Sequence, residues 1–191
     1  MKKVVIVGVG ALGSHVLQFA RNIDSSFRII DFDRVEQKNV ASQFHGKPSV
    51  STLKVAGLKQ SMQFLFGLKV ETISNKLVEN NVEQLLGGQD LVLDCLDNGT
   101  ARRVVQNFIR RASIPCLHGA LDANGSFGCI TWDEHFVIDD EPGQGAATCE
   151  DGEHLPFIAT SAALLARAAQ EFLKSGRKIG FLLNPGGAVR T

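Results

Sequence analysis

The chain has 191 residues, of which 44% are hydrophobic and 21% are charged. This length allows one domain with a proper core, but not two large ones, and the composition is typical of a soluble globular protein. The 20 basic and 20 acidic residues cancel, so neither a nucleic acid nor a membrane surface is indicated as a partner. No apolar run is long enough to cross a membrane. The four cysteines form no CxxC pair, which favours a reducing, cytoplasmic location.

As far as residue 117, the hydrophobic pattern alternates between strands and helices. The predicted strands are residues 3–7, 27–31, 69–74, 90–95 and 114–117. The predicted helices are residues 11–22, 51–66, 82–86 and 100–112, and residues 34–50 are polar and irregular. Ser51 or Thr52 is expected to cap the second helix. This alternation predicts an α/β fold with a Rossmann-like, doubly wound and mostly parallel sheet.

The remaining segments predict an antiparallel portion of the sheet in the C-terminal half. Two antiparallel strands, residues 126–132 and 135–138, are expected around Asp133 and Glu134. An acidic, glycine-rich loop, an alanine-rich helix and a closing strand then occupy residues 139–152, 155–174 and 179–183. We therefore expect a single domain over residues 1–183 and a flexible tail over residues 184–191.

A glycine-rich turn follows the first predicted strand and opens the first helix. Gly8 permits a tight turn, Gly10 lets the backbone approach a phosphate, and Gly13 lets helix and strand pack closely. The helix start at Ala11 offers free N–H groups and a positive dipole end to phosphates. Asp31 follows about 20 residues later, where a carboxylate can hydrogen-bond a ribose. The turn fits a dinucleotide-dependent oxidoreductase or an ATP-dependent enzyme, and the alternative is a turn that binds no ligand.

Four further segments distinguish between these classes. They are the DFDRVEQKNV segment at residues 31–40, LKVA around Lys54, DCLDN at residues 94–98, and TCEDG at residues 148–152. In this order and spacing, the chain resembles the ThiF/MoeB superfamily of adenylating enzymes, which activate ubiquitin-like proteins and sulfur carriers. The resemblance covers nearly the whole chain. It implies an adenylation domain that uses ATP and Mg²⁺.

The resemblance also implies a set of site residues. Lys54 would contact the phosphates, and Asp97 would hold Mg²⁺, a hard cation that prefers carboxylate and phosphate oxygens. The alternative for Lys54 is a solvated helix lysine. Asp94 could pair with Asp97 as an acid and a base, although its place in an apolar strand favours a structural role. The residues implied at the nucleotide are Gly8, Gly10, Ala11, Gly13, Asp31, Asp33, Asn39, Gln43, Lys54, Asp97 and Asn98.

Cys149 is the one cysteine in a setting that suggests chemistry, a polar loop shortly before a helix. The resemblance implies that it could take the acyl group from the adenylate as a thioester. The acidic neighbours Glu150, Asp151 and Glu153 would raise its pKa, and adenylation itself does not need this cysteine. For Cys95, Cys116 and Cys129, core packing is the expected role.

The chain departs from the family pattern at several points. Ser42 stands where the family has an arginine, and the arginine of a preceding N-terminal helix has no counterpart. Both would steady the phosphates, and Arg34, Lys38 or Lys47 are candidate replacements. The CxxC pairs that bind zinc in relatives are missing, so we expect no structural zinc site.

The leading hypothesis is an ATP-dependent adenylyltransferase that activates the C-terminal carboxylate of a small carrier protein ending in Gly-Gly. The resemblance further implies a homodimer, to which the apolar helix 155–172 contributes an interface unless it is simply core. The alternatives are a catalytically weak scaffold of the same family, motivated by Ser42, and an NAD-dependent dehydrogenase, for which Asp31 would suit the ribose.

Overall fold

The computed structural model describes residues 1–122, 124–138 and 152–191. Within these residues one mixed sheet has the strand order β3-β2-β1-β4-β5-β6-β7-β8. Its strands are β1 (Lys2–Val7), β2 (Ser25–Ile30), β3 (Val70–Ile73), β4 (Leu91–Asp94), β5 (Cys116–Leu121), β6 (Gly128–Trp132), β7 (Phe181–Asn184) and β8 (Gly187–Arg190). The helices are α1 (Ala11–Ala20), α2 (Lys54–Phe66), α3 (Val82–Leu86), α4 (Gly99–Ala112) and α5 (Leu155–Ser175). Three 3-10 turns are η1 (Gln37–Ala41), η2 (Lys47–Ser49) and η3 (Asp133–His135).

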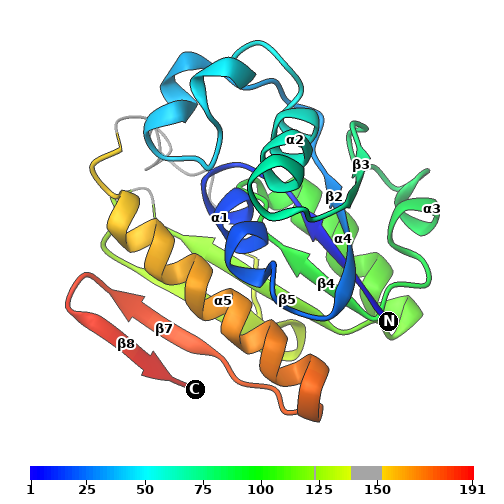
Figure 1. Cartoon of the computed structure of the whole chain (residues 1–191). Coiled ribbons are helices and arrows are strands. Elements are labelled where there is room, and N and C mark those ends of the chain that lie inside the picture. The colour runs from blue at the N-terminus through cyan, green and yellow to red at the C-terminus, as the bar shows by residue number, and fades with distance from the viewer. Residues whose placement is uncertain (123, 139–151) are drawn as a thin grey trace.

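The sheet is parallel in its first half and antiparallel in its second. Strands β1 to β5 pair in parallel, whereas β6, β7 and β8 each pair antiparallel with the preceding strand. This confirms the expected Rossmann-like, mostly parallel α/β fold with an antiparallel C-terminal portion. Figure 1 shows the hairpin of β7 and β8 at the edge of the sheet, beside α5.

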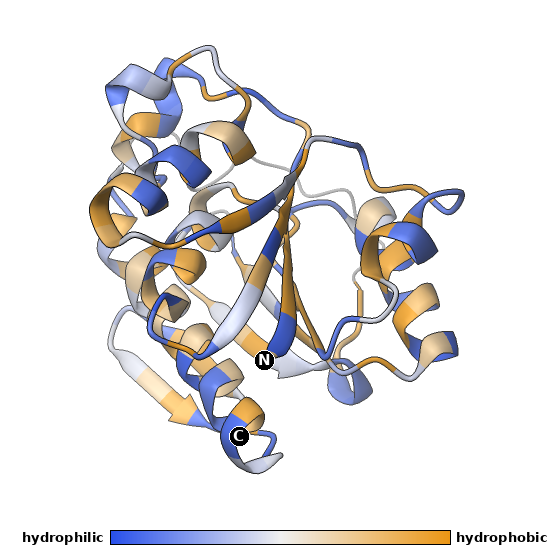
Figure 2. Cartoon of the chain, turned by 45° about the vertical axis from the view of Figure 1, so that its right-hand side comes forward, coloured by the Kyte–Doolittle hydropathy of each residue, from blue (hydrophilic) through white to orange (hydrophobic). Residues whose placement is uncertain are grey.

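Helices cover both faces of the sheet. Alternate residues of a strand point to opposite faces, so each face of β1 packs against different helices. Val4 and Ile6 pack in the core that includes the buried faces of α1, α2 and α5, and Val5 and Val7 pack in the core of α3 and α4. A strand buried on both faces needs a continuous apolar run. Figure 2 shows this run in β1, which changes from blue to orange beyond the N-terminus.

The prediction of a strand over residues 135–138 is wrong. Residues 133–135 form η3, and β6 pairs instead with β5 on one side and β7 on the other. The reason lies in Asp133, which is buried and accepts hydrogen bonds from Gln106 and Arg110 of α4. These bonds to a helix end β6 at Trp132, where a hairpin partner would otherwise begin.

The prediction of a flexible tail over residues 184–191 is also wrong, because residues 187–190 form β8. This strand pairs with β7 across Pro185 and Gly186, and its register places Leu182 opposite Val189. Asn, Pro and Gly favour tight turns as well as flexible segments, and here the Asn184 side chain accepts a hydrogen bond from the Gly186 N–H at 2.8 Å.

Two smaller observations complete the fold. Helix α2 begins at Lys54 rather than at residue 51, and neither Ser51 nor Thr52 caps it, because the N-cap is Leu53. Within the described residues, none of the helices combines the length and the hydrophobicity needed to cross a lipid bilayer.

Candidate nucleotide-binding site

The glycine turn between β1 and α1 has the geometry that its sequence predicts. Gly8 has a φ of +82°, and a Cβ there would lie 2.9 Å from the Cys95 carbonyl oxygen. A Cβ at Gly13 would overlap the carbonyl oxygen of Gly8. At Gly10, by contrast, the nearest atom to an added Cβ would be Gln43 Nε2 at 4.0 Å. The fold therefore requires glycine at the first and third positions, while the second borders open space at the start of α1.

The start of α1 retains free hydrogen-bond donors. Its N-cap is Gly10, and no side chain of the described residues caps it. The first N–H groups of an α-helix have no partner within the helix, and together with the helix dipole they favour an anion. The open space at Gly10 and these donors fit a phosphate group.

Asp31 follows β2 and has a structural role in the turn. Its Oδ2 accepts the N–H of Val9 at 2.8 Å, and its Oδ1 accepts the N–H of Asp33 at 2.8 Å. Burial raises the pKa of Asp31, while the nearby Lys54 charge and these two hydrogen bonds oppose that shift. Each carboxylate oxygen keeps a second lone pair, so contact with a ribose stays a prediction.

Lys54 is the first residue of α2, and it is buried rather than solvated. Its side chain is 10% exposed, and Nζ lies 3.1 Å from Asp33 Oδ2. The backbone N–H of Lys54 also donates to the carbonyl of Asp33 at 2.8 Å. A lysine buried and anchored to Asp33 in this way is not a solvated helix lysine.

The segment that links β2 to α2 lies against the turn. Asn39 is buried, and its Oδ1 accepts the N–H of Glu36 at 2.8 Å, which stabilises η1. Ser42 is 1% exposed, and its carbonyl faces His15 Nε2 at 3.0 Å. Gln43 is buried beside Gly10, and its Oε1 has no hydrogen-bond partner in the described residues. Gln43 therefore joins Asp31 as a predicted residue whose side chain lies at the turn.

The candidate replacements for the family arginine are already engaged or exposed. Arg34 Nη1 donates to the Ser51 carbonyl at 2.7 Å, and Lys38 lies 3.6 Å from Glu36. Lys47 is exposed in η2. Lys54, by contrast, is buried at the end of β2, and its charge acts on Asp31, which binds the glycine turn.

The loop after β4 carries the DCLDN segment. Asp94 is fully buried and accepts hydrogen bonds from Arg102 Nη1 at 3.1 Å and from the Leu96 N–H at 3.0 Å. Burial alone would raise its pKa, but the charge of Arg102 and the hydrogen bond from His118 lower it. Asp94 is thus an ionised anchor of the loop, as its apolar strand suggested. Asp97 is exposed and without a partner in the described residues, and Asn98 caps α4 by accepting the Ala101 N–H at 2.8 Å.

A buried polar network, which the sequence did not predict, lies behind this loop. His118 of β5 lies between two carboxylates, with Nδ1 2.7 Å from Asp94 and Nε2 3.1 Å from Asp133. Phe136 stacks on its ring at 4.2 Å. The available signal was a histidine inside an apolar strand, since a buried polar side chain needs partners, but the identity of those partners depends on the fold.

The three described cysteines differ in how far they are buried. Cys116 is buried in β5 and Cys95 is partly buried beside the glycine turn, and burial raises the pKa of both thiols. Cys129 is partly buried in β6. Cys149 lies outside the described residues. Within those residues, no group of three His, Cys, Asp or Glu side chains could share a metal ion.

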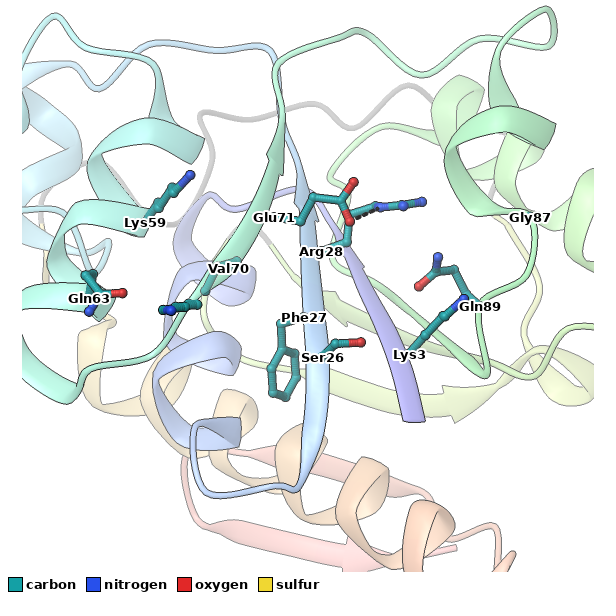
Figure 3. A pocket seen from close by; sticks show the side chains of 11 residues that line it. Lys3, Ser26, Phe27, Arg28, Lys59, Gln63, Val70, Glu71, Gly87 and Gln89 are labelled. Atoms are coloured by element: carbon teal, nitrogen blue, oxygen red, sulfur yellow. Dashed lines mark hydrogen bonds and ion pairs between the residues drawn. The ribbon is translucent and has the colours of Figure 1, made fainter. Parts of the chain in front are cut away.

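A separate cavity of about 610 Å³ lies at the opposite end of the strands (Figure 3). Its lining includes Lys3, Ser26 and Val70, which lie near the starts of β1, β2 and β3. The glycine turn follows the end of β1, so this cavity is not the site that the motifs define.

The fold and the turn define a Rossmann-like α/β protein of the type that binds ligands at the carboxyl ends of its strands. The sequence profile of the ThiF family matches residues 1–178, and the chain belongs to this family.

Two relatives and one solved structure illustrate the similarity. The SAMP-activating enzyme E1 of Haloferax volcanii is 30% identical over 125 residues, which are 62% of this chain and 45% of the relative. The molybdopterin-synthase adenylyltransferase of Salmonella typhimurium is 26% identical over 185 residues, which are 90% of this chain and 72% of the relative. The structure of E. coli MccB with ATP matches 100% of this chain and 63% of its own, with a TM-score of 0.77 and 16% identity. The chain thus spans less than half of the first relative.

Proposed function

We propose that the chain is an ATP-dependent adenylyltransferase that activates the C-terminal carboxylate of a small ubiquitin-like or sulfur-carrier protein. One observation carries this proposal. The glycine turn, the Asp33–Lys54 pair and the Asp97 loop follow β1, β2 and β4, which are adjacent in the sheet. Because these strands are parallel, their carboxyl ends meet at one edge, where nucleotides bind in such sheets.

The chemistry assigns different tasks to these groups. The carrier carboxylate attacks the α-phosphate of ATP, an acyl adenylate forms, and pyrophosphate leaves. The N–H groups at the start of α1 bind phosphate oxygens, and Lys54 stabilises the charge that develops on them. Asp97 is the ligand we assign to Mg²⁺, since it is an exposed carboxylate with no partner in the described residues. The Mg²⁺ would neutralise phosphate charge.

In the absence of ATP, Lys54 is paired with Asp33. Asp33 is half exposed, so water screens its attraction for Lys54. A polyphosphate carries more charge and can replace Asp33 as the partner of the ammonium group. Asp31, Asn39, Gln43 and Asn98 border the same region, although Asn39 and Asn98 already cap local turns.

Related proteins support the choice of substrates. The relatives are named as an adenylyltransferase and as an activating enzyme, and the MccB structure contains ATP. We extend to this chain a Gly-Gly carrier terminus, a homodimer, a cytoplasmic location and a thioester on Cys149. These are proposals from family resemblance.

A second candidate function is a scaffold that binds nucleotide or a carrier without turnover. Ser42 favours it, because the family arginine is replaced by a buried residue whose backbone is bound by His15. The scaffold and the enzyme differ in whether pyrophosphate is exchanged.

The test is ATP–pyrophosphate exchange with a panel of small proteins that end in Gly-Gly. We expect one carrier to stimulate exchange, Lys54→Ala to abolish it, and Lys59→Ala to retain it. Lys59 is the matched control, because it is an exposed lysine of the same helix. ATP binding without exchange for every carrier would favour the scaffold. Exchange that Lys54→Ala leaves unchanged would contradict the proposed site.

A further inference from the structure

Val9, inside the glycine turn, has both of its backbone groups bound by side chains. Its N–H donates to Asp31 Oδ2 at 2.8 Å, and its carbonyl oxygen lies 3.0 Å from His45 Nε2. The two side chains come from different segments, the end of β2 and the link between η1 and η2. The backbone just before Gly10 is therefore fixed from two sides.

Packing alone does not explain why a histidine is buried at position 45. It is 4% exposed, and its Nδ1 has no hydrogen-bond partner in the described residues. Since a carbonyl only accepts, Nε2 carries the ring proton and Nδ1 is a buried, unpaired acceptor. Leaving such a group unsatisfied costs about 1–3 kcal/mol. A leucine would fill similar space without this cost, so the bond to Val9 is what the histidine adds.

The surroundings keep the imidazole of His45 neutral. Burial lowers the pKa of His45 to about 4, and the positive charge of Lys54 acts in the same direction. The hydrogen bond to Val9 opposes them. Near pH 7 the ring therefore has one proton, and that proton is on the nitrogen that faces Val9.

The bond to Val9 also sets the direction of the next N–H group. In a trans peptide the carbonyl and the N–H point in opposite directions, and no peptide bond among the described residues is cis. By holding the Val9 carbonyl, His45 directs the Gly10 N–H away from itself. Gly10 is the turn glycine that borders open space.

We propose that His45 is a positioning residue of the nucleotide site, which fixes the Val9–Gly10 peptide so that the N–H groups at the start of α1 face the phosphates of ATP. This inference rests on the proposed function. His45 does not contact the reacting atoms in this role, because it acts through the backbone of the turn.

His15 provides a matched control. It is also a buried histidine, and its Nε2 also lies 3.0 Å from a backbone carbonyl. That carbonyl belongs to Ser42, outside the turn, and His15 Nδ1 faces Gln18 at 3.3 Å. A variant of His15 therefore removes a comparable bond without releasing Val9.

The experiment measures the Kd of ATP with Mg²⁺ by calorimetry, together with thermal unfolding, for the whole chain and four variants. His45→Leu and His45→Asn should weaken binding about tenfold, which corresponds to one lost hydrogen bond. His45→Gln should restore binding to within about threefold, because its amide reaches the position of Nε2. His15→Leu should keep the Kd within about threefold, whatever its effect on Tm.

An NMR measurement distinguishes a positioning role of His45 from a general loss of structure in the variants. In ¹⁵N-labelled protein, ATP should shift the Gly10 amide resonance in the wild type and in His45→Gln, but not in His45→Asn. Equal weakening by His15→Leu and His45→Leu, or wild-type affinity in His45→Leu, would overturn this inference alone. A wild-type chain that binds no ATP would overturn both this inference and the proposed function.

Discussion

Lys54 is bound twice to the same residue, because its Nζ lies 3.1 Å from the Asp33 carboxylate and its backbone N–H donates to the Asp33 carbonyl at 2.8 Å. The backbone bond fixes where α2 begins, and the side-chain bond directs the ammonium group toward the end of β2. The lysine is thereby held near the glycine turn before any substrate arrives, which reduces the ordering needed on binding.

Lys54→Met should separate catalysis from stability. The change keeps the length of the side chain and removes its charge, so we expect exchange activity to fall by about 10²-fold or more, as for loss of other electrostatic contacts to a transition state. Unfolding in urea should change by about 1 kcal/mol or less, because the partner Asp33 is half exposed. Asp33→Asn is the control, and its activity should fall less than that of Lys54→Met. The reverse order would contradict the role of Lys54.

Alanine substitutions in the glycine turn should have different effects at different positions. Gly10→Ala has room for its Cβ, so we expect a normal Tm and a Kd for ATP raised about tenfold or more, since the methyl group occupies the phosphate space. Gly13→Ala would force the Gly8 carbonyl to move, so it should unfold at a clearly lower temperature. Calorimetry and thermal unfolding of both variants check this contrast. Equal ATP affinity in Gly10→Ala and wild type would place the phosphates elsewhere.

Asp94→Asn should destabilise the fold strongly. It removes the charge that compensates the buried Arg102 and that faces His118, so we expect a loss of about 3–5 kcal/mol in urea unfolding. Asp90→Asn is the matched control, because Asp90 pairs with Lys2 at the surface and should cost about 1 kcal/mol or less. A small effect of Asp94→Asn would mean that the carboxylate does not anchor the loop.

His45 should make stability depend on pH between about 4 and 6.5. Its pKa is about 4 in the folded chain and 6.5 as the reference value, so the unfolded chain binds more protons in this window. The free energy of unfolding therefore rises with pH in this window, and the full contribution of the neutral His45 is present above pH 6.5. The loss at pH 4 relative to pH 7 should be about 3 kcal/mol.

A comparison of the wild type with His45→Gln isolates this effect. The raised pKa of Asp31 acts with the opposite sign, because the folded chain then binds the proton more tightly, and the lowered pKa values of Asp94 and Asp133 act below about pH 4. These contributions are shared by both proteins and cancel in the difference. A pH-independent difference between pH 4 and 6.5 would contradict a buried neutral His45.

The sequence predicted features that depend on local geometry and periodicity. Gly8 and Gly13 were identified because a strand, a turn and a helix impose the same steric limits wherever they occur. Asp94 was recognised as structural from its apolar strand. The anchoring of Lys54 was not predictable, since its burial depends on the path of the segment between β2 and α2.

The features that the sequence does not predict depend on contacts between distant residues. Asp133 ends β6 because Arg110, 23 positions earlier, reaches it from α4. His118 gains its two carboxylate partners only when β4 and β5 pair. The last residues were expected to be loose, because the Pro-Gly turn alone does not indicate that β6 provides an edge for β7.

The order β2-β1-β4 has a consequence for how the protein folds. Residues 8–13, 33–54 and 94–98 are far apart along the chain, and they meet only when three neighbouring strands have paired. A partly folded chain that lacks β4 has no complete site, so ATP would bind the finished parallel half and stabilise it by an amount that grows with the logarithm of its concentration over Kd. Nucleotide binding would thus report whether the N-terminal half of the sheet has assembled.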